Sequence, residues 1–230
     1  MMGLTPYEKE EKWIAKVQRT WSPERKDFDP AKHPRGEGGR FGEGSGSGDS
    51  AIVSENRKEE NYRGIKAISF APQGSVDVDL IKENRAVVNS VLDKLPKGAA
   101  DGLNALYITS GDFTPLGTAT YIAPSKQRGY VSDEIMTQQA WLNKSPVDKE
   151  ASLLHEFGHR MQLVSHKDIF KRFSAQGLGV HFSSLTEPQY QKAYPKKQHN
   201  GESFAESFAR YKIGKDMPNE LVTFWKGTGL

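Results

Sequence analysis

Five consecutive residues have the types and the spacing of a zinc-binding catalytic motif: His155, Glu156, Phe157, Gly158 and His159. Residues i and i+4 of a helix lie one above the other, so both imidazoles could bind one Zn²⁺. Glu156, next to the first histidine, could then reach a water on the metal and act as its general base. The alternative reading is a helix that carries two histidines by chance.

This chemistry requires a helix, and the residues around the motif predict one. Ser145 can cap it, Pro146 suits the first helical position, and Asp148 brings negative charge to the first turn. Apolar residues recur on one face at Leu153, Phe157, Met161 and Val164. Gly158 is the exception, because glycine inside a helix costs about 1 kcal/mol relative to alanine. A close approach by a neighbouring backbone would explain it.

Catalytic zinc usually has three protein ligands and one open position. A cysteine ligand is excluded because the chain contains no cysteine. A metzincin would have glycine and a third histidine where this chain has Gln162 and Ser165. A glutamate from a later helix remains, and residues 200–214 predict such a helix, with Asn200 as its cap and Gly214 at its end.

Two carboxylates of this later helix, Glu202 and Glu206, lie one turn apart and share a face. A different face is apolar and consists of Phe204, Phe208 and Tyr211. The small side chains of Ala205 and Ala209 would let the helix approach another element closely. One carboxylate could bind zinc while the other orients a ligand histidine through its second ring nitrogen. The spacing does not decide which is which, and a solvated glutamate pair is the alternative.

The two motifs together resemble the catalytic domain of the anthrax lethal factor family, which are gluzincin-type metallopeptidases. The resemblance consists of HEFGH at 155–159 and ESFAE at 202–206, with 42 residues between His159 and Glu202, and it covers about residues 60–230. It implies a zincin-like fold. It also implies that Glu202 is the third zinc ligand and that Glu206 orients a ligand histidine.

The resemblance further implies a tyrosine shortly before the ligand glutamate, which would stabilise the oxyanion of the transition state. Tyr194 lies eight residues before Glu202. The family spacing is one residue shorter and falls on Pro195, so Tyr190 remains an alternative. Two further candidates for this donor are His181 and His199.

The rest of the domain is expected to be α+β. Strands are predicted at 66–70, 105–111, 117–125 and 129–136, with a helix at 76–95. The last two strands flank a polar turn and should form a hairpin. A small mixed sheet would then pack on the motif helix and on the helix that bears Glu202. Segment 118–123 is expected either at a sheet edge, where it could hold an extended peptide, or inside the sheet.

Three regions are predicted along the chain. Residues 1–21 should form an amphipathic helical segment, 22–58 a flexible linker, and 60–230 the metallopeptidase domain. In the linker, seven of the thirteen residues from Gly36 to Gly48 are glycine, which leaves too little apolar surface to pack. The tract FDPAKHPRGEGGRFG resembles phage-encoded head and polyvalent proteins. That resemblance implies a phage head or host protein partner, bound through residues 1–21.

Net charge and hydropathy argue against a nucleic-acid-binding protein and against a membrane-spanning protein. The net charge is only +3, without a dense basic cluster, so no nucleic acid partner is expected. No apolar run is long enough to span a membrane, and the N-terminus does not resemble a signal peptide. The compartment stays open, whether virion-associated or cytoplasmic before delivery.

The sequence therefore predicts a zinc-dependent endopeptidase that acts on a polypeptide substrate, with Glu156 as general base. Two alternatives stay open. One is a phage head-associated or effector interaction protein that carries an inactive or accessory zincin domain. The other is a zinc hydrolase that acts on a non-peptide amide.

Overall fold

A computed structural model describes residues 59–111, 117–124 and 132–230, all of which belong to one structural unit. The predicted helical segment 1–21 and the predicted linker 22–58 lie outside the described residues. Residues 125–131, which include most of the predicted hairpin turn and the start of the predicted strand 129–136, lie outside them too.

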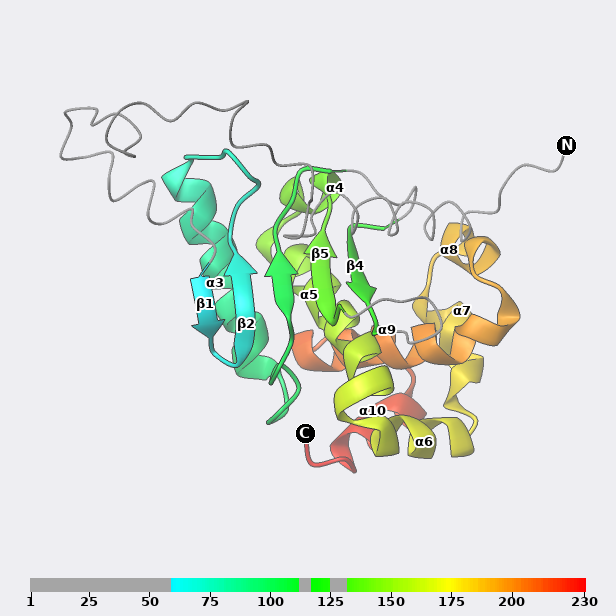
Figure 1. Cartoon of the computed structure of the whole chain (residues 1–230). Helices are drawn as coiled ribbons and strands as arrows, with labels where there is room; N and C mark the ends of the chain where they lie inside the picture. Colours follow the sequence, from blue (N-terminus) through cyan, green and yellow to red (C-terminus); the bar gives the residue numbers. More distant parts are fainter. Residues whose placement is uncertain (1–58, 112–116, 125–131) are drawn as a thin grey trace, which may run out of the picture. The chain divides into compact units, whose positions relative to one another are not determined.

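A five-stranded mixed sheet forms one layer of the domain (Figure 1). Its strands are β1 (Glu59–Tyr62), β2 (Ile65–Ser69), β3 (Ala105–Tyr107), β4 (Ala119–Ile122) and β5 (Glu134–Thr137), in the order β1-β2-β3-β5-β4. The pairs β1/β2 and β4/β5 are antiparallel, whereas β3 runs parallel to both of its neighbours. The predicted α+β class is confirmed, and a strand overlaps each of the four predicted segments, although β3 ends at Tyr107 and not at residue 111; β1 was not predicted.

Strand β4 lies at one end of the sheet. It pairs with β5 through four register positions, from Ala119 opposite Thr137 to Ile122 opposite Glu134. In the part of the chain that the structure describes, no strand pairs with its other side. The edge position, one of the two expected for this segment, is therefore correct, and so is the antiparallel pairing of the predicted hairpin.

Helix α3 (Val78–Lys94) and the motif helix α5 (Pro146–Arg160) pack together on the same face of the sheet (Figure 1). The Asp77 side chain caps α3 by accepting hydrogen bonds from two backbone amides at 3.0 Å. The short helix α4 (Gln139–Leu142) leads into α5. As predicted, Ser145 caps α5, and Pro146 occupies its first turn.

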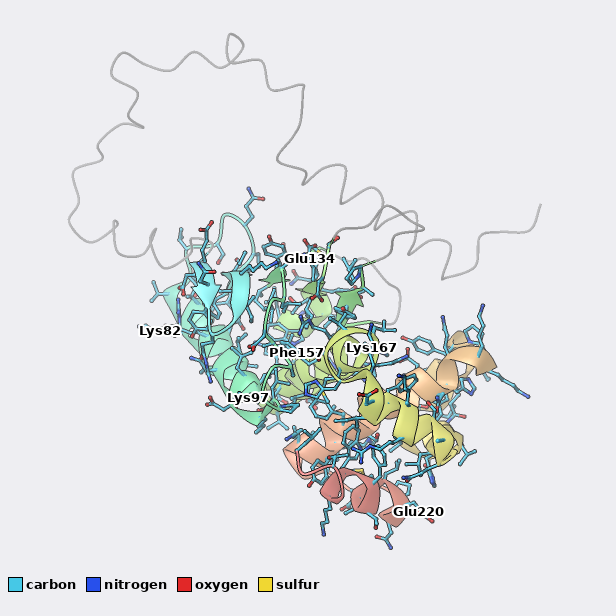
Figure 2. The ribbon with its side chains drawn as sticks, turned by 60° about the horizontal axis from the view of Figure 1, so that its bottom comes forward. Lys82, Lys97, Glu134, Phe157, Lys167 and Glu220 are labelled. Carbon is cyan, nitrogen blue, oxygen red and sulfur yellow. The ribbon has the colours of Figure 1, made fainter. Side chains whose placement is uncertain are left out.

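The apolar stripe of α5 follows the prediction for three of its four residues. Leu153, Phe157 and Met161 are fully buried, and Figure 2 shows Phe157 near the centre of the domain. Val164 is only half-buried because α5 changes at Met161 into the π-helical turn η2 (Met161–Ser165). The amide of His166 donates to the Met161 carbonyl at 2.9 Å, and this wider i+5 turn breaks the 3.6-residue period.

A helical layer follows in the chain. It consists of α6 (Lys167–Ala175), α7 (Phe182–Leu185), α8 (Pro188–Ala193), α9 (His199–Ile213) and α10 (Asn219–Lys226), with 3₁₀ turns η3 (Leu178–His181) and η4 (Lys196–Gln198). Only α9 was predicted. Aromatic rings join three of these helices, α6, α9 and α10, in one cluster, which we call the aromatic cluster: Phe170, Phe173, Phe204, Phe208, Tyr211, Phe224 and Trp225. Among the described residues, no helix combines the length and the apolarity needed to cross a bilayer.

Helix α9 crosses α5 at very short range. A Cβ added to Gly158 would lie 2.7 Å from Ala205 Cα and 3.1 Å from Ala205 Cβ. The close approach that was expected to explain Gly158 is therefore present, and its partner is the small residue Ala205 of α9.

The ends of α9 agree only in part with the prediction. Gly214, with φ of 70°, ends α9 as predicted. The prediction that Asn200 caps the helix is wrong, because α9 already begins at His199. The Asn200 side chain instead donates to Ser174 Oγ at 2.6 Å and ties α9 to α6.

Candidate metal centre

Helices α5 and α9 bring three possible metal ligands together. The two imidazole Nε2 atoms of His155 and His159 lie 3.1 Å apart, with the ring planes at 78°. Glu202 Oε2 lies 3.4 Å from His155 Nε2 and 3.5 Å from His159 Nε2. Three ligand atoms from two separate segments thus form a nearly equilateral triangle.

The size of this triangle fits a tetrahedral zinc ion. Zinc binds nitrogen and oxygen ligands at about 2.0–2.2 Å, so tetrahedral ligand atoms lie roughly 3.3–3.6 Å apart. The three distances of 3.1, 3.4 and 3.5 Å come close to that range. The close contact between Gly158 and Ala205 makes this possible, because it lets Glu202, one turn before Ala205, reach the histidines.

A second carboxylate orients the first histidine from behind. Glu206 Oε2 lies 3.3 Å from His155 Nδ1, the ring nitrogen that does not face the triangle. Arg210 Nε donates to the other oxygen of Glu206 at 2.8 Å. The same guanidinium also donates to the carbonyls of Leu185 at 2.7 Å and Asp216 at 3.0 Å, so its position is fixed by three acceptors. A carboxylate on the outer nitrogen sets the tautomer and orientation of a metal-binding histidine.

Glu156 lies beside the triangle and is 9% exposed. Its Oε2 accepts a hydrogen bond from the backbone amide of Tyr121 in β4 at 2.7 Å. The Tyr121 hydroxyl donates to Asp133 Oδ1 at 2.8 Å. Asp133 also accepts from Arg160, the residue after His159, at 3.0 Å from Nε and 2.8 Å from Nη2.

Burial and charge shift the pKa values of the whole cluster. Burial lowers the pKa of His155 and of His159, but the hydrogen bonds and negative charge of the nearby glutamates outweigh it, so both pKa values end above their ordinary value of 6.5. Burial raises the pKa of Glu202, but the two imidazoles reverse this and hold it well below its usual range. For Glu206, hydrogen bonds from His155 and Arg210 likewise outweigh burial and lower the pKa to about 2.

Glu156 behaves in the opposite way. Burial raises its pKa, and the positive charge of the histidines and the Tyr121 amide reduce that rise without cancelling it. The site therefore holds one carboxylate with a raised pKa beside two carboxylates with lowered pKa values. Such a division of roles is typical of acid–base sites.

Two of the predicted oxyanion donors lie at the start of α9: Tyr194 shortly precedes this helix, and His199 is its first residue. Tyr194 packs edge-on against Phe182, with ring centroids 6.3 Å apart. His199 stacks on the same Phe182 at 4.2 Å, and its Nε2 lies 3.0 Å from the Tyr194 carbonyl oxygen. His181 ends the turn η3 and is half-buried. The side chain of Tyr190 lies outside the described part of the structure, and the role of Tyr194 stays a prediction.

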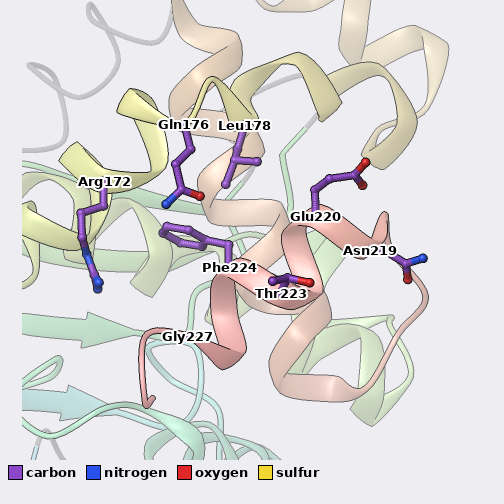
Figure 3. Close-up of a pocket in the computed structure, with 8 residues that line it drawn as sticks. All are labelled: Arg172, Gln176, Leu178, Asn219, Glu220, Thr223, Phe224 and Gly227. Atoms are coloured by element: carbon purple, nitrogen blue, oxygen red, sulfur yellow. The ribbon is translucent and has the colours of Figure 1, made fainter.

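A groove of about 550 Å³ lies between α6, η3 and α10 (Figure 3). Leu178 and Phe224 form its buried floor, and Arg172 and Glu220 are on its exposed rim. The residues that line this groove do not include the triangle ligands or Glu156, so we do not assign it to the same chemistry.

Sequence reasoning missed two parts of the site. Arg210 follows Glu206 at i+4, a common ion-pair spacing on helices that could have revealed it. Tyr121 had no comparable signal, because the group that contacts Glu156 is a backbone amide, which almost every residue has. Only the expected edge position of the strand that contains Tyr121 suggested that this backbone could contribute to the site.

Comparisons of this chain with known proteins find no match. A scan against protein-family models, a search of curated proteins and a search of solved structures each return no match. The proposal for function therefore depends on the geometry of the site.

Proposed function

We propose that this chain is a zinc-dependent peptidase with a zincin-like, gluzincin-type catalytic domain. The observation that carries the proposal is the triangle of His155, His159 and Glu202, with ligand atoms 3.1–3.5 Å apart beside the buried Glu156. His155 and His159 come from one helix and Glu202 from another, which is the arrangement of a two-histidine, one-glutamate zinc site.

Zinc supplies two effects in such a site, a lower pKa for a coordinated water and polarisation of the substrate carbonyl. The chain supplies the remaining groups. Glu206 and Arg210 keep the His155 ring in the orientation that points Nε2 into the triangle.

Glu156 moves the protons in this proposal. It accepts a proton from the attacking water and delivers it to the nitrogen of the leaving amine. Burial raises its pKa, which brings the carboxylate closer to the working pH and makes it a better acceptor and donor in turn. Tyr194 remains the proposed donor to the oxyanion.

The edge strand β4 favours a peptide substrate over a small amide. An exposed strand edge can bind an extended peptide through main-chain hydrogen bonds. Strand β4 lies directly beside Glu156, because Tyr121 in its centre donates to that carboxylate. A peptide laid along β4 would therefore pass the general base.

The test measures both the metal content of the protein and its cleavage of peptides. Purified full-length protein is analysed for metal content and incubated with a peptide library, with and without a chelator. The proposal requires about one zinc per chain and cleavage that stops on chelation and resumes when zinc is restored. Cleavage that survives complete removal of metal, or a zinc-loaded chain that cleaves no library peptide, would contradict it.

A further inference from the structure

Tyr121 holds Glu156 with its backbone and the motif helix with its side chain. Its amide donates to Glu156 Oε2 at 2.7 Å, and its hydroxyl donates to Asp133 Oδ1 at 2.8 Å. Asp133 in turn is bound by Arg160, which follows His159 on α5. We propose that Tyr121 is a positioning residue that fixes the carboxylate of Glu156 for proton transfer. This inference rests on the proposed function.

The geometry of an edge strand makes the amide available. In an antiparallel pair, alternate N–H groups point toward the partner strand, and the others point away from it. At a sheet edge, the outward groups would ordinarily meet water or another strand. Tyr121, opposite Ile135 of β5, instead directs its N–H to a buried carboxylate. An amide on a strand has little freedom, so it restricts the carboxylate more than a mobile side chain would.

The phenol determines where that amide lies. The side chains of Asp133 and Arg160 are 10% and 2% exposed and form a buried ion pair. Arg160 also donates to the carbonyl of Asp101 at 3.0 Å and to that of Ala99. Because Arg160 belongs to α5, the pair is fixed relative to the motif helix. The Tyr121 hydroxyl thus sets the distance between β4 and the helix that carries Glu156.

Tyr121→Phe tests this link with little risk to the fold. The substitution keeps the ring and the backbone N–H and removes only the hydroxyl. Asp133 still accepts two hydrogen bonds from Arg160, so no buried charge loses its partner. Tyr62→Phe is the matched control, because it removes a hydroxyl that donates to Asn89 Oδ1 at 2.7 Å from β1, at the opposite end of the sheet.

The first measurement is steady-state kinetics on a peptide that the wild-type chain cleaves. Tyr121→Phe should lower kcat more than about fivefold and leave KM within about twofold, because a misplaced base affects the chemical step. Zinc content should stay at the wild-type value, and Tyr62→Phe should match wild type. A kcat within about fivefold of the control, or a loss expressed only in KM, would overturn the proposal.

The second measurement does not depend on activity. In ¹H–¹⁵N spectra of the labelled, zinc-loaded full chain, a hydrogen bond to a carboxylate shifts an amide proton downfield. The residue 121 amide should therefore move upfield in Glu156→Ala and in Tyr121→Phe, but not in Tyr62→Phe. An unchanged residue 121 amide in Glu156→Ala would refute the contact itself. A chain without any peptidase activity would instead count against the proposed function, and the amide shifts would still test the contact.

Discussion

Gly158→Ala should perturb the proposed metal centre without changing any of its candidate ligands. The added Cβ would lie 2.7 Å from Ala205 Cα and 3.3 Å from the Ala205 carbonyl oxygen. Carbon atoms pack at about 3.5–4.0 Å, so the helices α5 and α9 must separate by about 1 Å. Neither contact can be relieved by a side-chain rotation, because both involve the backbone of α9.

The magnitude follows from two opposing effects. Overpacking costs about 1–3 kcal/mol, whereas replacing glycine by alanine inside a helix recovers about 1 kcal/mol. A net loss of up to about 2 kcal/mol should lower Tm by up to about 8 °C in a domain of this size. The effect on zinc should be larger. A shift of about 1 Å in Glu202 exceeds the roughly 0.2 Å tolerance of zinc–ligand distances, so affinity should fall at least about tenfold.

Thermal melting and zinc titration of the chelator-treated protein measure both effects. Gly227→Ala is the matched control: Gly227 is helical in φ, and an added Cβ would only reach ordinary contact at 3.4 Å. The control should keep the wild-type zinc affinity. Wild-type zinc affinity in Gly158→Ala would refute the reasoning that this contact sets the ligand geometry.

Three further predictions concern the site directly. Glu156→Gln should retain zinc and fold but lose peptidase activity by several orders of magnitude, measured by turnover beside metal analysis; near-normal turnover would exclude Glu156 as the base. Glu202→Ala should weaken zinc binding more than Glu206→Ala in calorimetric titration, and the reverse order would exchange their roles. The raised pKa values of His155 and His159 give the chelator-treated protein stability below pH 6.5 that is lost as pH rises through the raised values. Because zinc binds the unprotonated rings, the Tm difference between zinc-loaded and chelator-treated protein should widen as pH rises above 6.5, and a constant difference would disprove this linkage.

The parts of the fold that the sequence revealed are those with a local cause. The cap at Ser145, the proline at 146 and the apolar period predicted α5 correctly. The glycine at position 158 also predicted a close approach by another backbone, which is that of Ala205 in α9. Helices α6, α7, α8 and α10 escaped prediction because they are short. Helices α6 and α10 also gain stability from the aromatic cluster, which joins residues far apart in the chain.

In the candidate site, too, the features that could be predicted are those with a local cause in the sequence. His155 and His159 share one helix, so their common direction follows from the helical period. The helical period identifies Glu202 and Glu206 only as a pair. The family resemblance assigned the ligand role to Glu202, and in the structure Glu202 faces the triangle while Glu206 faces His155 Nδ1. The failed prediction of an Asn200 cap has a similar cause. The Asn200 side-chain amide donates to Ser174 of α6, and this tertiary hydrogen bond outweighs the local preference of asparagine for capping a helix.

Helix α10 gives the metal centre a dependence on chain synthesis. Trp225 of α10 donates to Ser207 Oγ at 3.1 Å and packs on Phe204 and Phe208, the face of α9 opposite its carboxylates. Until α10 has left the ribosome, Phe204 keeps its contacts with Phe170 and Phe173 of α6, but this face lacks the cover of Trp225, so α9 is held less firmly on α5. A growing polypeptide would thus carry all three candidate zinc ligands before the helices that hold them are fully packed. In the proposed peptidase, hydrolytic capacity would therefore develop only after α10 has folded onto α9.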